Sequence, residues 1–169
     1  MIKAKKSLGQ NFLKDKNIVN KILDLIDITN RNILEVGPGT GNLTSGILEK
    51  KPKKLILIEK DESLVSLLKN KFPSKIDLIN EDILRIDENN LLDEKLIVFG
   101  NLPYNISTEI LIKWILNLKK TPWFECLILM FQKEVADRIV AKQGSKNYGR
   151  LSILTNWLTK SKKLFDIPS

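Results

Sequence analysis

The sequence contains no histidine, only one cysteine and no long run of apolar residues. The absence of histidine excludes histidine-based catalytic triads, histidine metal sites and a histidine general base, so we expect no metal centre. Cys126 has no second cysteine to pair with, which excludes an internal disulfide. No apolar run approaches the roughly 20 residues of a membrane-spanning helix. The basic N-terminus is not followed by the apolar segment of a signal peptide. We therefore expect a cytoplasmic protein that does not associate with membranes.

The length and apolar content indicate a single domain. A chain of 169 residues, 43% of them hydrophobic, can bury a substantial core but is short for two domains. The sequence shows no internal repeat and no low-complexity linker. We expect one domain over residues 1–169, and a monomer.

The net charge of +8 is unevenly distributed along the chain. Residues 1–60 hold 12 basic and 6 acidic side chains, residues 61–118 hold 6 and 10, and residues 119–169 hold 10 and 4. Two basic ends flanking an acidic middle suit a polyanionic partner such as a nucleic acid. A lysine-rich surface in contact with solvent explains the same charge equally well.

From Ile33 onward, short apolar segments alternate with longer amphipathic ones. Asp15 is expected to cap a helix whose apolar side reaches Ile26, and Asp61 to cap a helix that stops before Pro73. The alternation indicates an α/β fold with a mostly parallel, doubly wound sheet covered by helices on both faces. The apolar segments are typical of buried strands, at residues 33–36, 55–58, 76–79, 96–99 and 126–130.

The residues that follow the expected strands can bind a nucleoside. In open parallel sheets, ligands bind beyond the carboxyl ends of the strands. Glycines after the first strand let the backbone approach a ligand closely, and the next helix offers N–H groups to an anion. An acidic residue at the end of the second strand can accept hydrogen bonds from both ribose hydroxyls. In strand order, these ends carry Gly37, Gly39 and Gly41, then Glu59, Asp82 and Asn101.

The spacing of the glycines argues against a dinucleotide. A nicotinamide fingerprint places its third glycine at position 42, where this chain has Asn42. We therefore expect a nucleoside without a pyrophosphate. A tight turn with no ligand is the other explanation of the glycines.

The stretch from Gly100 to Tyr104 combines an amide, a rigid turn and an aromatic ring. The exocyclic nitrogen of adenine is a weak nucleophile unless hydrogen-bond acceptors hold its two N–H groups. The Asn101 side-chain oxygen and the Leu102 carbonyl are such acceptors, and Pro103 fixes the direction of that carbonyl. Tyr104 offers a face to an unstacked base. The alternative is an ordinary turn at the end of a strand.

Five segments carry a resemblance to known proteins. Residues 33–41, Ile-Leu-Glu-Val-Gly-Pro-Gly-Thr-Gly, resemble the first motif of S-adenosylmethionine-dependent methyltransferases with a doubly wound, Rossmann-like class I fold. Residues 6–13, 101–108, 132–136 and 148–152 resemble motifs of the bacterial small-subunit ribosomal RNA adenine dimethyltransferases. The resemblance covers nearly the whole chain, in order.

The resemblance implies S-adenosylmethionine as cofactor and assigns roles within the site. Asn101, Leu102, Pro103 and Tyr104 would form the catalytic turn, with Asn101 between cofactor and target amine. Tyr104 and Phe131 would sandwich the flipped adenine, although Phe131 suits the core equally well. For the cofactor, the basic segment 1–13 would contribute Asn11 and Leu13 at the methionine end; Gly37 and Gly39 would line it, Glu59 would hold the ribose and Asp82 would meet the adenine amino group.

The implied reaction is the dimethylation of two adjacent adenines near the 3′ end of 16S ribosomal RNA, in the 30S subunit or its precursor. That activity belongs to ribosomal RNA processing and ribosome biogenesis, and requires RNA binding. One alternative is the macrolide-resistance branch, which modifies large-subunit RNA, but Leu102 and residues 132–136 favour the small-subunit branch. A non-catalytic ribosome-assembly or RNA-binding factor is a second alternative.

The resemblance ends where the family continues with a final antiparallel strand and a C-terminal helical domain. We expect residues 162–166, which would pair with that strand, to leave an open sheet edge that is frayed, rearranged or covered by a neighbour. Cys126 lies within an expected strand and is interpreted as a core residue. A mechanism that needs a cysteine nucleophile is thereby disfavoured.

Overall fold

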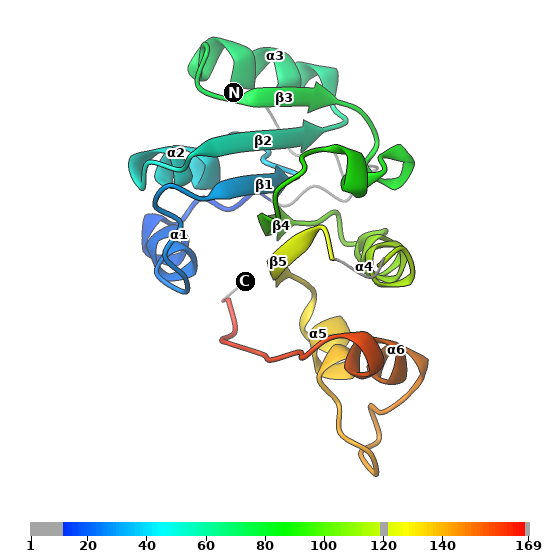
Figure 1. Cartoon of the computed structure of the whole chain (residues 1–169). Helices are drawn as coiled ribbons and strands as arrows, with labels where there is room; N and C mark the ends of the chain where they lie inside the picture. The colour runs from blue at the N-terminus through cyan, green and yellow to red at the C-terminus, as the bar shows by residue number, and fades with distance from the viewer. Residues whose placement is uncertain (1–11, 119–121, 168–169) are drawn as a thin grey trace.

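The fold is built on a five-stranded parallel sheet in the order β3-β2-β1-β4-β5 (Figure 1). The computed structural model describes residues 12–118 and 122–167. The strands are β1 Asn32–Val36, β2 Lys54–Glu59, β3 Asp77–Asn80, β4 Leu96–Asn101 and β5 Phe124–Met130. The helices are α1 Lys16–Leu23, α2 Asn42–Glu49, α3 Glu62–Lys71, α4 Ser107–Leu116, α5 Lys133–Ile139 and α6 Arg150–Leu158, with short 3-10 turns η2 Ile83–Arg85 and η3 Glu88–Asn90.

The strand order reverses at β1, which pairs with β2 on one side and β4 on the other. Doubly wound sheets bind their ligands at such a reversal, beyond the carboxyl ends of the two strands. The predicted fold class is confirmed, and every strand pair among the described residues is parallel.

Alternation along the strands divides the core into two layers, because successive side chains in a strand point to opposite faces. Helices α1, α2 and α3 cover one face, and α4 covers the other (Figure 1). The first layer contains Ile33, Leu57, Ile97 and Phe99, and the second contains Leu34, Val36, Ile58 and Val98.

All five strands lie where the sequence predicted them, with shifted ends. The most important shift is in β4, which extends to Asn101, so this residue ends the strand instead of lying in the turn after it. The caps are also confirmed. The Asp15 side chain accepts from the backbone N–H of Asn17 and that of Asp61 from Ser63, and α3 ends at Lys71.

The first helix is shorter than predicted. It ends at Leu23, and Leu25, which was expected on its apolar side, is exposed. Val19, Ile22 and Leu23 pack into the first core layer from the helix, whereas Ile26 and Ile28 reach the same layer after the helix has ended.

The outer side of β5 has no strand partner among the described residues. Residues 160–167 form neither helix nor strand, and run from α6 toward α1 (Figure 1). Lys163 Nζ lies 3.1 Å from Asp137 of α5, and the Phe165 ring lies beneath Lys21 of α1, 4.1 Å from its Nζ. The expectation of an incomplete sheet edge is therefore confirmed in a rearranged form: the last described segment packs on α1 instead of extending the sheet.

No helix in the described part of the chain is long and apolar enough to cross a membrane.

Candidate cofactor and base site

The glycine turn after β1 touches the end of β4. Gly37, Gly39 and Gly41 adopt φ values of 70°, 58° and 76°, a region that side chains disfavour. A Cβ atom on Gly37 would lie 2.8 Å from the backbone carbonyl oxygen of Asn101, closer than real Cβ contacts. Only glycine at position 37 allows the ends of β1 and β4 to approach this closely. The glycine predicted to let the backbone approach a ligand is therefore also required by the packing of these two strand ends.

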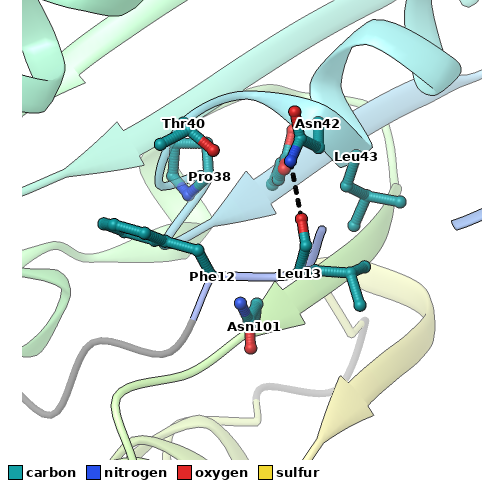
Figure 2. Close-up of a pocket in the computed structure, with 9 residues that line it drawn as sticks. Phe12, Leu13, Pro38, Thr40, Asn42, Leu43 and Asn101 are labelled. Carbon is teal, nitrogen blue, oxygen red and sulfur yellow. Dashed lines mark hydrogen bonds between the residues drawn. The ribbon is translucent and has the colours of Figure 1, made fainter. Parts of the chain in front are cut away.

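A hollow lies between this turn and the N-terminal segment (Figure 2). It brings together three of the predicted site residues, Leu13, Gly37 and Asn101. Its remaining lining residues are Phe12, Glu35, Pro38, Thr40, Asn42 and Leu43.

The segment before α1 is held in the hollow by the glycine turn. The side-chain amide of Asn42 donates to the Leu13 carbonyl at 2.7 Å, as Figure 2 shows. A Cβ on Gly39 would lie 2.9 Å from the Phe12 ring, so that ring packs directly on the turn. Phe12 and Asn42 were not predicted as site residues, and Asn11 lies outside the described residues. Asn42 does more than replace a third glycine, because it fixes the N-terminal segment.

Glu59 ends β2 beside the same turn and is 8% exposed. Its Oε1 accepts from the backbone N–H of Asp61 at 2.9 Å. Burial raises the pKa of Glu59, while hydrogen bonds from the backbone N–H groups of Asp61 and Gly39 oppose that rise. A carboxylate fixed in this way retains lone pairs for a pair of hydroxyls.

Glu35, within β1, is a buried acid at the hollow and was not predicted as a site residue. It is 2% exposed, and Thr44 Oγ1 donates to its Oε2 at 2.7 Å. Burial raises the pKa of Glu35 to about 8, with the charge of Glu59 adding to the rise and that of Lys71 opposing it. At neutral pH this side chain is therefore mainly a neutral carboxylic acid.

Asp82 lies farther along the same sheet edge, after β3, and does not line the hollow. Its Oδ1 caps η2 by accepting from Leu84 N–H at 3.0 Å, and its Oδ2 accepts from Lys60 Nζ at 2.7 Å. The Lys60 hydrogen bond lowers the pKa of Asp82, so it is a carboxylate at neutral pH. The Asn80 side chain, which donates to the Glu59 carbonyl at 3.0 Å, connects the ends of β3 and β2.

The catalytic turn predicted from the sequence leads directly into α4. The Leu102 side chain is buried in the core, so only its backbone can face a ligand. The Pro103 carbonyl accepts from Ile106 N–H at 3.1 Å, and the Tyr104 carbonyl from Ser107 Oγ at 3.2 Å. These bonds fix the turn, and the Tyr104 side chain is half-buried.

Two further residues, Cys126 within β5 and Phe131 directly after it, do not line the hollow. Phe131 is half-buried and packs against apolar side chains on both sides of α4, outside the hollow. Cys126 is half-buried, not a full core residue as expected, because β5 lies at the edge of the sheet. Burial and the charge of Glu125 raise the pKa of the Cys126 thiol, which disfavours the thiolate that a nucleophile needs.

The chain is similar to known proteins over nearly its whole length. The chain is 60% identical to a ribosomal RNA small subunit methyltransferase A of Pelagibacter ubique over 98% of its length, and 45% identical to one of Cereibacter sphaeroides over 99%. It spans only 63% and 61% of those relatives, about three fifths of their length.

Solved structures share the fold. A dimethyladenosine transferase from Plasmodium falciparum superposes with a TM-score of 0.74 at 33% identity, covering 86% of this chain and 52% of that one. A 23S rRNA methyltransferase, ErmE, gives a TM-score of 0.69 at 27% identity, covering 86% and 57%. The profile of the family described as ribosomal RNA adenine dimethylase matches residues 1–169, and the chain belongs to that family.

Proposed function

We propose that the chain is the catalytic domain of a 16S ribosomal RNA adenine N6,N6-dimethyltransferase that uses S-adenosylmethionine. Its substrate would be two adjacent adenines near the 3′ end of the small-subunit RNA, in the 30S subunit or its precursor. The observation that carries the proposal is the backbone approach of Gly37 to Asn101, which brings a nucleoside-binding turn against an amide suited to an adenine amine.

The residues around the glycine turn fit the cofactor. A Cβ at Gly37 would strike the Asn101 carbonyl and one at Gly39 the Phe12 ring, so only glycine lets the turn pack this closely against the segments that line the hollow. We assign Asn11 and Leu13 to the methionine end, Glu59 to the ribose hydroxyls and Asp82 to the adenine amino group. When bound, S-adenosylmethionine supplies an electrophilic methyl group on a sulfonium.

The chain contributes orientation and hydrogen-bond acceptors to the reaction. Asn101 Oδ1 and the Leu102 carbonyl would accept the two N–H groups of the target adenine, which favours a pyramidal nitrogen and frees its lone pair. Tyr104, with Phe131, would hold the extruded base by stacking. The nitrogen would take the methyl group as its carbon–sulfur bond breaks, leaving a neutral thioether, and the methylated nitrogen would release one proton to solvent. The monomethylated amine keeps one N–H for Asn101, so a second transfer needs no new residue.

Charge and comparisons support the substrate class. The net charge of +8 suits a ribosomal RNA partner, and we place the protein in the cytoplasm as a monomer. The small-subunit names of the relatives at 60% and 45% identity favour 16S RNA. The similarity to a 23S rRNA methyltransferase keeps the large-subunit branch as the second candidate.

The decisive experiment incubates the chain and S-adenosylmethionine with unmethylated small subunits, and analyses the RNA by mass spectrometry. An Asn101→Ala variant is the control. Two methyl groups on each of two neighbouring adenines, absent with the variant, are expected. Methylation of 23S RNA accompanied by protection from macrolides would favour the second candidate. RNA binding that survives Asn101→Ala, without methyl transfer by the parent chain, would favour a non-catalytic assembly factor.

A further inference from the structure

Lys113 on α4 uses all of its hydrogen-bond donors within the protein. Its Nζ donates to the carbonyl oxygen of Ile83 at 2.8 Å, to the carbonyl oxygen of Ile86, and to Glu88 Oε1 at 2.6 Å. A lysine ammonium has three N–H groups. The side chain is 18% exposed, which is unusual for a lysine at the surface of a helix. The three N–H groups of Lys113 therefore all bind the segment that connects β3 with β4.

Glu88 completes the cluster. It is 1% exposed, and its Oε1 also accepts from the indole N–H of Trp114 at 2.7 Å. Its Oε2 has no hydrogen-bond partner within the described structure. Two consecutive residues of α4, Lys113 and Trp114, thus hold one buried carboxylate.

The cluster fixes the turn that begins at Asp82. Ile83 is the first residue of η2, and Ile86 directly follows its last residue. Because Lys113 donates to the carbonyls of both, it binds the turn at its two ends. Asp82 is the residue before η2 and caps it. Any movement of the turn relative to α4 would move the Asp82 carboxylate.

The same helix carries the other end of the proposed site. Helix α4 starts at Ser107, whose hydroxyl is bonded to the carbonyl of Tyr104 at 3.2 Å. The catalytic turn is therefore tied to the first residue of α4, while the Asp82 turn is tied to the seventh. One rigid helix connects the two.

We propose that Lys113 is a positioning residue that places Asp82 for recognition of the cofactor's adenine amino group, in fixed relation to Asn101. The inference rests on the proposed cofactor site. Asp82 already accepts from Leu84 N–H and Lys60, one on each oxygen, and each oxygen retains a lone pair for an amine. Recognition of one N–H group then depends on where the carboxylate is held.

The test measures binding of two ligands to the full 169-residue chain by titration calorimetry. One is S-adenosylhomocysteine, and the other is its analogue with hydrogen in place of the 6-amino group. The parent should prefer the amino ligand by about tenfold, the size of one charge-assisted hydrogen bond. In Lys113→Met, affinity for the amino ligand should fall about tenfold and that for the analogue less than twofold.

The matched control is Lys54→Met. Lys54 forms an exposed ion pair with Asp77 at 3.0 Å, at the opposite end of the strands, and its loss should change neither affinity. An Asp82→Asn variant should lose the same preference, and adding Lys113→Met to it should cost nothing more for the amino ligand. If Lys113→Met fails to fold because Glu88 loses its counter-charge, Glu88→Gln/Lys113→Met removes that charge and is measured instead.

Each outcome bears on a separate claim. Equal loss of both ligands in Lys113→Met would mean that the lysine only supports the fold, and would overturn the inference. An unchanged preference in that variant would overturn it as well, while leaving the cofactor site intact. A parent chain that binds both ligands equally would refute the assignment of Asp82, and one that binds neither would refute the proposed function; the role of Lys113 falls with either.

Discussion

The carbonyl oxygen of Asn101 lies 2.8 Å from the position that a Cβ atom on Gly37 would occupy. The turn after β1 and the end of β4 are therefore in backbone contact, without any side chain between them. The proposed methyl transfer takes place where these two segments meet, and it depends on their close backbone approach.

A Gly37→Ala substitution should abolish cofactor binding. The methyl group must displace the backbone of Asn101, and the left-handed conformation costs roughly 1–2 kcal/mol more. Gly144→Ala is a matched control, because Gly144 has φ 88° with nothing within 4 Å of its Cβ position. Calorimetry should show no binding for the first variant and parental affinity for the second. Equal behaviour of the two would mean that the close approach is unimportant.

Replacement of Glu59 should weaken binding of S-adenosylhomocysteine by about tenfold or more, since a buried carboxylate that accepts from hydroxyls contributes about 1.5–3 kcal/mol. Glu59→Gln keeps an acceptor for the Asp61 N–H and limits the structural damage that Glu59→Ala brings. Glu62→Ala, at an exposed position of α3, is the control. Unchanged affinity in both Glu59 variants would contradict its assignment to the ribose.

The stability of the protein should fall as the pH rises from about 4.5 to about 8 because of Glu35. Its pKa of about 8 in the folded protein stands against an ordinary value of 4.5, so the folded state holds a proton that the unfolded chain has lost. That stabilisation is complete below about 4.5 and is lost at up to about 1.4 kcal/mol per pH unit.

Urea denaturation of the parent and Glu35→Gln across this pH range tests the prediction. Glutamine still accepts from Thr44 but does not titrate, so its profile should be flatter than that of the parent. Burial also raises the pKa of Glu59, which is present in both proteins, so the difference between the profiles reports Glu35 together with its electrostatic interaction with Glu59. Parallel profiles would show that Glu35 titrates normally in the folded state.

Truncation of Phe165 should destabilise the protein by about 1–2 kcal/mol, because its ring packs against the core layer beside α1. Leu164→Ala is the control, since Leu164 is 49% exposed, and it should have little effect. Denaturation midpoints measure both. A larger loss for Leu164→Ala would place the terminal segment in another orientation.

Hydrogen exchange offers an independent check on that segment. The amides of residues 162–166 should exchange rapidly, because they lie in no helix or strand, whereas those of β4 should be strongly protected. Strong protection of residues 162–166 would indicate that they pair with the free side of β5.

Local patterns in the sequence were sufficient for most of the fold. Five apolar segments of strand length predicted five strands, and Asp15 and Asp61 cap the helices expected of them. These features depend on neighbouring residues, whereas the extension of β4 to Asn101 was missed because the apolar pattern stops at Phe99. The end of α1 was missed because Leu25 and Ile26 continue the apolar pattern beyond Leu23, where the helix ends.

The remaining site residues depend on contacts between distant segments. Phe12 and Leu13 belong to what reads as a basic tail, and reach the site only because Asn42 binds Leu13. In the sequence, Glu35 is a single polar residue within an apolar strand. Its raised pKa comes from burial by the whole sheet, which no local pattern reveals. The hydrogen bonds from Lys113 to the turn after Asp82 join residues about 30 positions apart, and no pattern in the sequence predicts such a contact.

The pairing of Val36 with Gly100 has a consequence for substrate choice. Adjacent strands of any sheet are about 4.8 Å apart, and backbone hydrogen bonds maintain that separation whatever the side chains are. In the proposed reaction, the separation of the two strand ends that would hold methyl donor and acceptor amine is therefore set by the sheet itself. Engineers who wish to redirect such a domain to another adenine should leave β1 and β4 untouched, and vary the loops that decide which nucleotide is delivered there.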